Sequence, residues 1–244
     1  MKVSRLVMPL RLFRTETGAI LYDPSRIDHP AEAYFDAAAL ERAGRVRATR
    51  GGRGSAWFVA MPGAGGGSEW VLRHCRRGGF VARWVQDSYL WLGEDRVRSF
   101  AELRLLAHFE NLDLPAARPV AAHYRRAGLA YRADLLTLAI PGARPLSALL
   151  GPDLPLSTWC AVGACIRRFH DAGAHHADLN AHNVLVDAAD RVHLVDFDRG
   201  ALRRDGAWKA ANLARLERSL LKLSRESPGL YRAEQWAALL EGYR

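Results

Sequence analysis

Two acidic residues and one asparagine have the types and spacing that metal-assisted chemistry requires. Asp178 precedes Asn183 by five residues, an apolar segment follows at once, and Asp196 stands 18 residues after Asp178 at the end of the next apolar segment. Because side chains become exposed where strands end, we expect the three to converge on one site. A carboxylate and a carboxamide supply the hard oxygen ligands that Mg²⁺ prefers, and the second carboxylate is left as a base.

The sequence around these residues resembles the catalytic motifs of protein kinases. Residues 176–183, HADLNAHN, are similar to the catalytic loop H-R-D-L-x-x-x-N, and residues 196–198, DFD, resemble the metal-binding D-F-G motif. The resemblance implies that Asp178 accepts or orients the acceptor hydroxyl. It also implies that Asn183 and Asp196 hold the metal ions that bridge the phosphates of ATP.

A glycine-rich segment upstream aligns with the loop that covers the phosphates in the same template. Residues 52–59, GRGSAWFV, resemble G-x-G-x-x-G-x-V, with Trp57 in place of the third glycine. By this resemblance Gly52, Gly54 and Ser55 belong to the part of the chain that binds the nucleotide, where backbone N–H groups can close over phosphate.

The template places a lysine on the strand after this loop, and the sequence has none there. Only three lysines occur in the chain, so the cation is expected to be Arg73 in the run Val-Leu-Arg. Arginine keeps the charge and can form a fork to phosphate. Its expected partner is Glu102, on a helix predicted over residues 96–109. The alternative is that both are ordinary surface charges.

Hydrophobic patterns predict the elements that position these residues. In the first half they predict a helix near residues 31–42, two strands over 51–59 and 70–75, a hairpin over 76–91, the helix over 96–109 and a buried strand over 131–140. In the second half they predict a helix capped by Ser157 or Thr158 and ended by Gly173, two short strands over 184–186 and 192–195, and an amphipathic helix over 207–223.

Together with the resemblance, these elements predict an α+β fold of the two-lobed protein-kinase type. The N-lobe is expected to be an antiparallel sheet and the C-lobe to be mainly helical and shortened. Residues 1–45 are expected to form a lead-in, residues 46–140 the N-lobe and residues 141–244 the C-lobe of one catalytic domain.

Departures from the protein-kinase pattern indicate a smaller acceptor than a peptide. Ala177 replaces the loop arginine, Asn180 replaces the loop lysine, and Asp198 replaces the glycine of D-F-G. Only 48 residues follow Asp196, and no A-P-E motif occurs among them. This length is too short for the activation segment and the helical platform on which a protein kinase binds its peptide substrate.

The combination of motifs resembles bacterial 3-deoxy-D-manno-octulosonic acid (Kdo) kinases of the lipopolysaccharide core kinase group. The runs VLRHCRRGG, SFAELRLL, HADLNAHNVLVD and VDFDRG carry the likeness, which covers roughly residues 45–225. It implies phosphorylation of a Kdo hydroxyl, at O4, by ATP and Mg²⁺. The implied acceptor is Kdo–lipid A at the cytoplasmic face of the inner membrane, with the enzyme bound peripherally. Neither nucleic acid nor an obligate protein partner is expected.

Interleaved arginines and aromatic residues form the candidate acceptor-binding segment. Arginines pair with carboxylate or phosphate, and aromatic faces stack on sugars. The residues concerned are Arg76, Arg77, Arg83, Trp84, Tyr89 and Trp91. Hairpin packing with a solvated edge is the alternative. Arg215, Arg218 and Lys222 on the last predicted helix could likewise touch acidic lipid, or could form the solvated face opposite its leucines.

Composition and charge exclude several classes of protein. Hydrophobic residues make up 49% of the chain, which is typical of a globular protein and not of a disordered one. The 35 Lys+Arg and 26 Asp+Glu give a net charge of 35 − 26 = +9, which favours an anionic partner. Three cysteines without zinc-type spacing favour a reducing compartment. Arg5 and Arg11 interrupt the first apolar run, so no signal peptide is predicted, and no segment approaches the ~20 apolar residues of a membrane span.

Four other interpretations each account for part of the sequence. A metal site made of His175, His176, Asp178 and His182 lacks the H-E-x-x-H spacing, and His176 fits a structural role in the loop better. A nucleic-acid-binding protein would explain the positive charge but not the acidic site residues. A catalytically inactive kinase-like protein would explain the missing lysine. A kinase of another small alcohol or sugar would keep both the fold and the catalysis.

Overall fold

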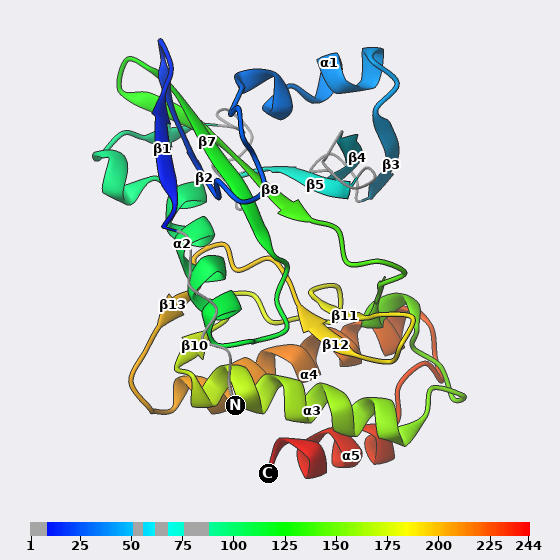
Figure 1. Cartoon of the computed structure of the whole chain (residues 1–244). Helices are drawn as coiled ribbons and strands as arrows, with labels where there is room; N and C mark the ends of the chain where they lie inside the picture. The colour runs from blue at the N-terminus through cyan, green and yellow to red at the C-terminus, as the bar shows by residue number, and fades with distance from the viewer. Residues whose placement is uncertain (1–8, 51–55, 62–67, 76–87) are drawn as a thin grey trace, which may run out of the picture. The chain divides into compact units, whose positions relative to one another are not determined.

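The computed structural model describes residues 9–50, 56–61, 68–75 and 88–244 (Figure 1). The chain divides into two compact units. Unit 1 comprises Met1–Asn111 and Arg118–Ala139, and unit 2 comprises Leu112–Ala117 and Ile140–Arg244. Each unit has its own core and carries its own part of the predicted site.

Unit 1 is built on an antiparallel sheet, which has eight strands in the part of the chain described. The order is β1 (Arg11–Arg14), β2 (Gly18–Tyr22), β7 (Pro119–Ala127), β8 (Ala130–Leu138), β5 (Ser68–His74), β4 (Ala56–Met61) and β3 (Val46–Arg50), and β6 (Tyr89–Leu90) pairs with β8. The two strands predicted on either side of the glycine-rich turn are β4 and β5, with Trp57 opposite Leu72. Strands β1 and β2, near the start of the chain, belong to the same sheet.

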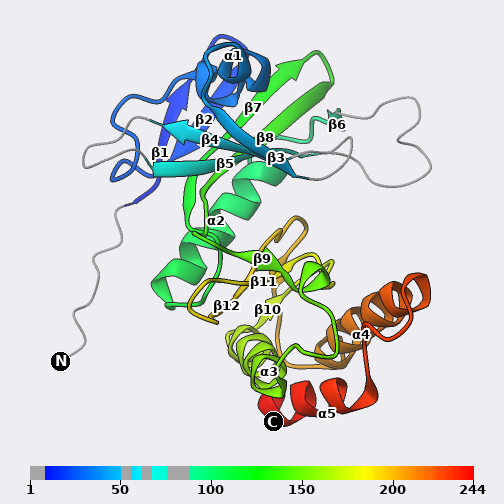
Figure 2. The ribbon, with the colours of Figure 1, turned by 90° about the vertical axis from the view of Figure 1, so that its right-hand side faces the viewer.

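Helices cover both faces of this sheet (Figure 2). The ring of His123 on β7 lies 4.8 Å from that of Phe35, whereas the next residue, Tyr124, packs edge-on against Phe100. Successive residues of a strand point to opposite faces, so the elements that carry Phe35 and Phe100 lie on opposite sides. Phe35 belongs to η1 (Glu32–Phe35), which is followed by α1 (Ala37–Arg42). Phe100 belongs to α2 (Arg98–Asn111), which is preceded by η3 (Glu94–Arg96).

The single helix predicted near residues 31–42 is wrong, because the structure divides it into η1 and α1 at Asp36. The backbone of Asp36 is extended, with φ −94° and ψ 92°, and its carboxylate accepts a hydrogen bond from the N–H of Ala39 at 2.9 Å. Aspartate in this position satisfies a free donor of the first helical turn. It therefore begins α1 instead of continuing η1.

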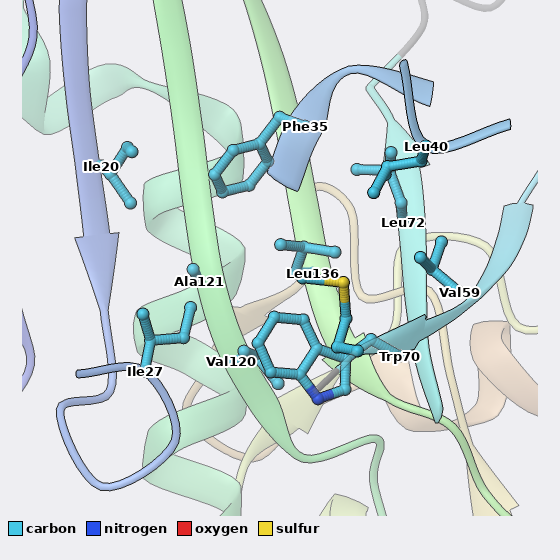
Figure 3. Packing of buried hydrophobic residues seen from close by; sticks show 11 residues of the cluster. Ile20, Ile27, Phe35, Leu40, Val59, Trp70, Leu72, Val120, Ala121 and Leu136 are labelled. Carbon is cyan, nitrogen blue, oxygen red and sulfur yellow. The ribbon is translucent and has the colours of Figure 1, made fainter. Parts of the chain in front are cut away.

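The core of unit 1 lies on the face that η1 and α1 cover (Figure 3). Phe35, Leu72 and Leu136 are fully buried there. Burial of each side chain of this size stabilises the fold by about 1.5–3 kcal/mol. Leu72 faces this core, so the alternation of side chains along β5 directs the next residue, Arg73, to the face that carries α2. Arg73 is thus positioned by the burial of its neighbour.

Unit 2 is mainly helical, with η4 (Leu146–Ala148), α3 (Leu156–Asp171), α4 (Trp208–Glu226) and α5 (Ala233–Tyr243). The apolar stripe predicted for α3 is confirmed, because Trp159, Val162, Ile166 and Phe169 are all buried. Gly173 follows the C-cap of α3 with φ +73°, as predicted for a residue that ends a helix.

The predicted cap of α3 is wrong. The helix begins at Leu156 after Pro155, and no side chain caps it. Thr158 is buried in the first turn, and its backbone N–H donates to the carbonyl oxygen of Pro155 at 3.0 Å. Pro155 occupies the N-cap position, two residues before the first polar cap expected from the sequence, and its ring fixes the backbone there.

Helices α3 and α5 approach each other so closely that backbone touches backbone at two glycines. A Cβ atom on Gly163 would lie 1.9 Å from the carbonyl oxygen of Leu239. A Cβ atom on Gly242 would lie 2.0 Å from the carbonyl oxygen of Cys160. Real Cβ atoms do not approach oxygen this closely, so each position admits only glycine unless the helices separate.

Short strands in unit 2 form the frame of the site. Strand β11 (Val184–Val186) pairs with β12 (Val192–Leu194) on one side and with β9 (Arg144–Pro145) on the other, and β10 (Ala174–His175) pairs with β13 (Ala201–Leu202). The strands predicted over 184–186 and 192–195 are therefore present. The fold class predicted from the sequence, α+β with an antiparallel-sheet unit and a mainly helical unit, is confirmed.

The turn between β11 and β12 is fixed by one buried carboxylate. Asp187 accepts hydrogen bonds from the backbone N–H groups of Ala189 and Arg191 and from the side chains of Arg191 and His193, at 2.9–3.0 Å. Burial raises the pKa of Asp187, but these hydrogen bonds outweigh burial and hold that pKa below its usual range. The closed end of the hairpin is thus held tightly, and its open end carries the site.

Candidate functional site

The open end of the β11–β12 hairpin brings two of the predicted site residues together. Asn183 immediately precedes β11, and Asp196 follows β12 after one residue. Val184 pairs with Leu194, and the backbone N–H of Val195 donates to the carbonyl oxygen of Asn183 at 3.0 Å. The antiparallel register therefore places the residue before one strand beside the residue after the other.

Asn183 and Asp196 supply oxygen donors of the kind that a hard metal ion takes. The Nδ2 group of Asn183 donates to the backbone carbonyl of Asp178 at 2.9 Å, which leaves its amide oxygen to act as a ligand. Asp196 has φ +63°, in the left-handed region that residues other than glycine rarely adopt. Strained backbone of this kind is concentrated at functional sites. One amide oxygen and one carboxylate form the kind of donor set that Mg²⁺ completes with phosphate oxygens and water.

His176 joins the catalytic loop to the end of β12. Its ring is buried, its Nε2 lies 2.9 Å from the carbonyl oxygen of Val195, and its Nδ1 accepts from the backbone N–H of Asp178 at 3.1 Å. These contacts require a neutral ring with its proton on Nε2, and burial lowers the pKa of His176 accordingly. The ring also packs 4.5 Å from that of Phe197. His176 has the structural role in the loop that was predicted for it.

The alternative metal site made of histidines and Asp178 is not formed. His182 instead pairs with the hydroxyl of Ser147 at 2.8 Å, and His176 is bound to backbone groups. Across the described ranges, the structure contains no group of three or more His, Cys, Asp or Glu side chains that could hold a metal ion.

The carboxylate of Asp178 is oriented at both oxygens and still exposed. Its Oδ1 accepts from Nη1 of Arg215 at 2.8 Å, and its Oδ2 accepts from Nδ2 of Asn180 at 3.1 Å. The side chain is 58% exposed. Asn180, which stands where a kinase has a lysine, also accepts the backbone N–H of His182 at 2.8 Å and so closes the turn of the loop. The result is a fixed carboxylate that a hydroxyl can reach.

Helix α4 holds the catalytic loop from one side. Asn212 donates to the carbonyl oxygen of His176 at 2.9 Å and accepts from the N–H of the same residue at 3.2 Å. Ser219 accepts from the backbone N–H of Ala181 at 3.2 Å. Together with Arg215, these residues lie three and four positions apart on one helix face. We call this set, Asn212, Arg215 and Ser219, the α4 clamp.

Asn212 and Ser219 were not among the residues predicted from the sequence. Helix α4 was predicted from its leucines, of which Leu216 and Leu220 are fully buried. The available signal was two small polar residues, Asn212 and Ser219, on the same helical face as those leucines. Polar residues on a buried face require partners, and here the partners are the backbone groups of the loop.

In unit 1 the predicted pair of Arg73 and Glu102 is formed. Nη2 of Arg73 lies 2.5 Å from Oε1 of Glu102, whose side chain is only 2% exposed, while that of Arg73 is 22% exposed. The carboxylate is therefore a buried group on α2 and not an ordinary surface charge. It fixes the position of the Arg73 guanidinium at the end of β5.

Seven of the predicted site residues lie outside the described residues. These are Gly52, Gly54 and Ser55 of the glycine-rich segment, and Arg76, Arg77, Arg83 and Trp84 of the basic-aromatic segment. Of the hairpin predicted over 76–91, the described part contains β6, which pairs with β8. Tyr89, which was expected to face the acceptor, is instead buried, with its ring 5.4 Å from that of Tyr131. On α4, Arg218 and Lys222 are exposed, and Lys222 lies 4.0 Å from Glu226.

These features are consistent with a kinase-like fold. Unit 1 joins a strand arginine to a buried helix glutamate, and unit 2 carries the predicted catalytic loop, residues 176–183, and the DFD sequence at the end of its hairpin. The model of the lipopolysaccharide kinase (Kdo/WaaP) family matches residues 38–243. The chain belongs to this family, and it is a kinase that transfers phosphate to an alcohol group.

Three similar proteins each carry the name 3-deoxy-D-manno-octulosonic acid kinase. The protein of Stenotrophomonas maltophilia strain K279a is 46% identical over 214 residues, which are 86% of this chain and 82% of that protein. The protein of Xanthomonas campestris pv. campestris strain B100 is 47% identical over 212 residues, 84% of this chain and 81% of that protein. The protein of Photobacterium profundum is 39% identical over 225 residues, 92% of this chain and 94% of that protein.

Among the helices of the described ranges, none is both long enough and apolar enough to cross a bilayer.

Proposed function

We propose that this protein transfers the γ-phosphate of ATP to a hydroxyl of Kdo, at O4, on Kdo–lipid A during assembly of the lipopolysaccharide core. The observation that carries this proposal is the exposed, doubly hydrogen-bonded carboxylate of Asp178 beside Asn183, whose position the β11–β12 register brings to the same end of the hairpin as Asp196. The names of the similar proteins support Kdo as the acceptor.

In this reaction the hydroxyl oxygen of the acceptor bonds to the γ-phosphorus, and Asp178 receives the proton of that hydroxyl. The bond between the γ-phosphorus and the oxygen that bridges it to the β-phosphorus breaks, and the products are ADP and the phosphorylated sugar. Asn183 and Asp196 would hold Mg²⁺, which neutralises charge on the phosphates when it is bound. Most of the catalytic effect of such a site comes from positioning and from charge neutralisation, which is consistent with the rigid hairpin and loop described above.

The nucleotide is proposed to be bound by residues of unit 1. Arg73, held by Glu102, offers a guanidinium to the phosphates, as the lysine does in the kinase template. Gly52, Gly54 and Ser55 are proposed, on the sequence resemblance alone, to cover the phosphates with backbone N–H groups. The basic-aromatic residues Arg76, Arg77, Arg83 and Trp84 are proposed, on the same ground, to contact the acceptor.

The acceptor also implies a location for the enzyme. Kdo–lipid A is a membrane lipid, so the enzyme is proposed to act as a peripheral protein at the cytoplasmic face of the inner membrane. The net charge of +9 favours an acidic lipid surface as the partner.

The decisive experiment is a transfer assay with labelled ATP and Mg²⁺ that offers Kdo–lipid A beside lipid A lacking Kdo. We expect label on the Kdo-bearing lipid alone, and analysis of the product by NMR should place the phosphate at O4. The Asp178→Asn protein serves as the blank. ATP binding without transfer to either lipid would contradict the proposal and would indicate a different small alcohol as acceptor.

Arg73→Ala is expected to raise the KM for ATP at least about tenfold. A hydrogen bond between charged groups typically contributes more than about 1.4 kcal/mol to the free energy of binding, and the variant loses this contact with the phosphates. The same change removes the cation beside the buried carboxylate of Glu102, so Tm should also fall. Arg73→Lys keeps the charge but loses the fork and should give an intermediate KM. Steady-state kinetics in ATP measure the effect, and unchanged ATP kinetics in Arg73→Ala would show that another cation binds the phosphates.

A further inference from the structure

Arg215 holds the proposed base and is itself half exposed beside it. Its Nη1 donates to Oδ1 of Asp178 at 2.8 Å, and this is the one hydrogen bond that the guanidinium makes to residues the structure describes. Its side chain is 48% exposed. A guanidinium has five N–H donors arranged in a planar fork, so four of them are not used by described residues and can bind another group beside Asp178.

The acceptor proposed above creates an electrostatic problem at this position. It is an acid, so its sugar carries a carboxylate in addition to the hydroxyl that receives the phosphate. If Asp178 contacts the hydroxyl, two carboxylates come within the dimensions of one sugar ring. Like charges at such separations repel, and repulsion would weaken binding of the acceptor that the enzyme has to select.

The groups around Asp178 identify the cation that can relieve this repulsion. His175 is close to Arg215, and burial together with the nearby charges of Arg203 and Arg215 lowers the pKa of His175, so its ring is neutral. Asn180 and Asn183 carry no charge. Arg215 is the cation whose position is fixed on Asp178 by a direct hydrogen bond, and a fork can bind two carboxylates at once.

We propose that Arg215 binds the carboxylate of the acceptor sugar while it remains paired with Asp178, and that it thereby makes the enzyme specific for a carboxylate-bearing sugar. This inference rests on the proposed function and extends it to the part of the substrate that is recognised. The γ-phosphate of ATP is a competing anion, but Asn183 and Asp196 would balance its charge by holding Mg²⁺. Arg215 is therefore assigned to the acceptor.

The test compares two acceptors with the same lipid: Kdo–lipid A, and Kdo–lipid A in which the Kdo carboxylate has been converted to a neutral methylamide. With the unmodified enzyme we expect kcat/KM to be about tenfold lower for the amide, which corresponds to about 1.4 kcal/mol for a charge-assisted hydrogen bond at a half-exposed site. With Arg215→Ala we expect a loss of similar size on the acid acceptor, mainly in its KM, and a difference of less than about threefold between the two acceptors. Arg215→Lys should recover part of the preference for the acid.

The matched control is Arg225→Ala, which removes the same side chain from the exposed surface of the same helix. Ten residues separate the two positions, or about 15 Å along the helix axis. This variant should retain the kinetics and the acid preference of the unmodified enzyme.

Three outcomes would contradict the role assigned to Arg215 and leave the proposed function standing. If Arg215→Ala still discriminates against the amide, another residue reads the carboxylate. A rise in the KM for ATP with discrimination intact would assign the guanidinium to phosphate. An equal loss of kcat on both acceptors, with discrimination intact, would mean that Arg215 only orients Asp178. Absence of transfer from the unmodified enzyme to the acid acceptor would instead overturn the proposed function, and the inference with it.

Discussion

Asp178→Asn is expected to lower kcat for transfer to Kdo–lipid A by about 10²–10⁴-fold, the usual contribution of a positioned general base. The amide has the size of the carboxylate and can still accept a hydrogen bond from Arg215, but it cannot take up a proton. Because Asp178 is 58% exposed and its ion pair lies near solvent, the fold should be almost unaffected. Initial rates at saturating ATP measure the effect, and thermal unfolding confirms that the variant is folded.

The matched control for this variant is Asp153→Asn, which neutralises an exposed aspartate in the same unit. It should retain full turnover. If Asp178→Asn also retained full turnover, the acceptor hydroxyl would have to be activated in some other way, and the assignment of the base would be lost.

Gly163→Ala is expected to cause a large loss of stability in unit 2. Its Cβ would lie 1.9 Å from the carbonyl oxygen of Leu239 and 2.7 Å from the backbone nitrogen of Tyr243, and both of these are backbone atoms of α5. Neither can rotate away, so α3 and α5 must separate. Overpacking of this kind costs about 3 kcal/mol, which corresponds to a fall in Tm of about 6–12 °C for a chain of this size. Differential scanning calorimetry measures the change.

Gly151→Ala is the control for this effect, because a Cβ atom there has no heavy atom within 4 Å. Its Tm should stay within a degree or two of the unmodified protein or rise slightly, since alanine has less freedom in the unfolded chain. A Gly163→Ala protein as stable as this control would show that the α3–α5 contact can relax.

The parts of the fold that the sequence predicted are those specified by local periodicity. The apolar stripe of α3, the leucines of α4 and the strands β4, β5, β11 and β12 all follow from the spacing of apolar residues. The pairing of β2 with β7 joins residues about 100 positions apart, and no local pattern specifies the partner of a strand. The close contact at Gly163 and Gly242 could not be predicted either, because a glycine that a helix contact requires has the same local signal in the sequence as any weak helix former.

The candidate site divides in the same way. Asn183 and Asp196 are brought together by a short hairpin, so their spacing along the chain was enough to predict their proximity. Arg73 and Glu102 were paired through the kinase template, and the burial of the carboxylate became visible only in the packing of α2. The contacts of Asn212, Arg215 and Ser219 depend on how α4 docks against the loop, which is a tertiary event without a local signature.

The α4 clamp also limits how the length of this chain can vary. Its three contacts depend on the rotational phase of the helix, because each residue advances the side-chain direction by about 100°. One residue inserted or deleted between Asn212 and Ser219 would turn Ser219 away from Ala181 or Asn212 away from His176, although every side chain would still be present. Substitutions on the outer face of α4 are therefore compatible with an ordered catalytic loop, whereas insertions and deletions within this stretch are not.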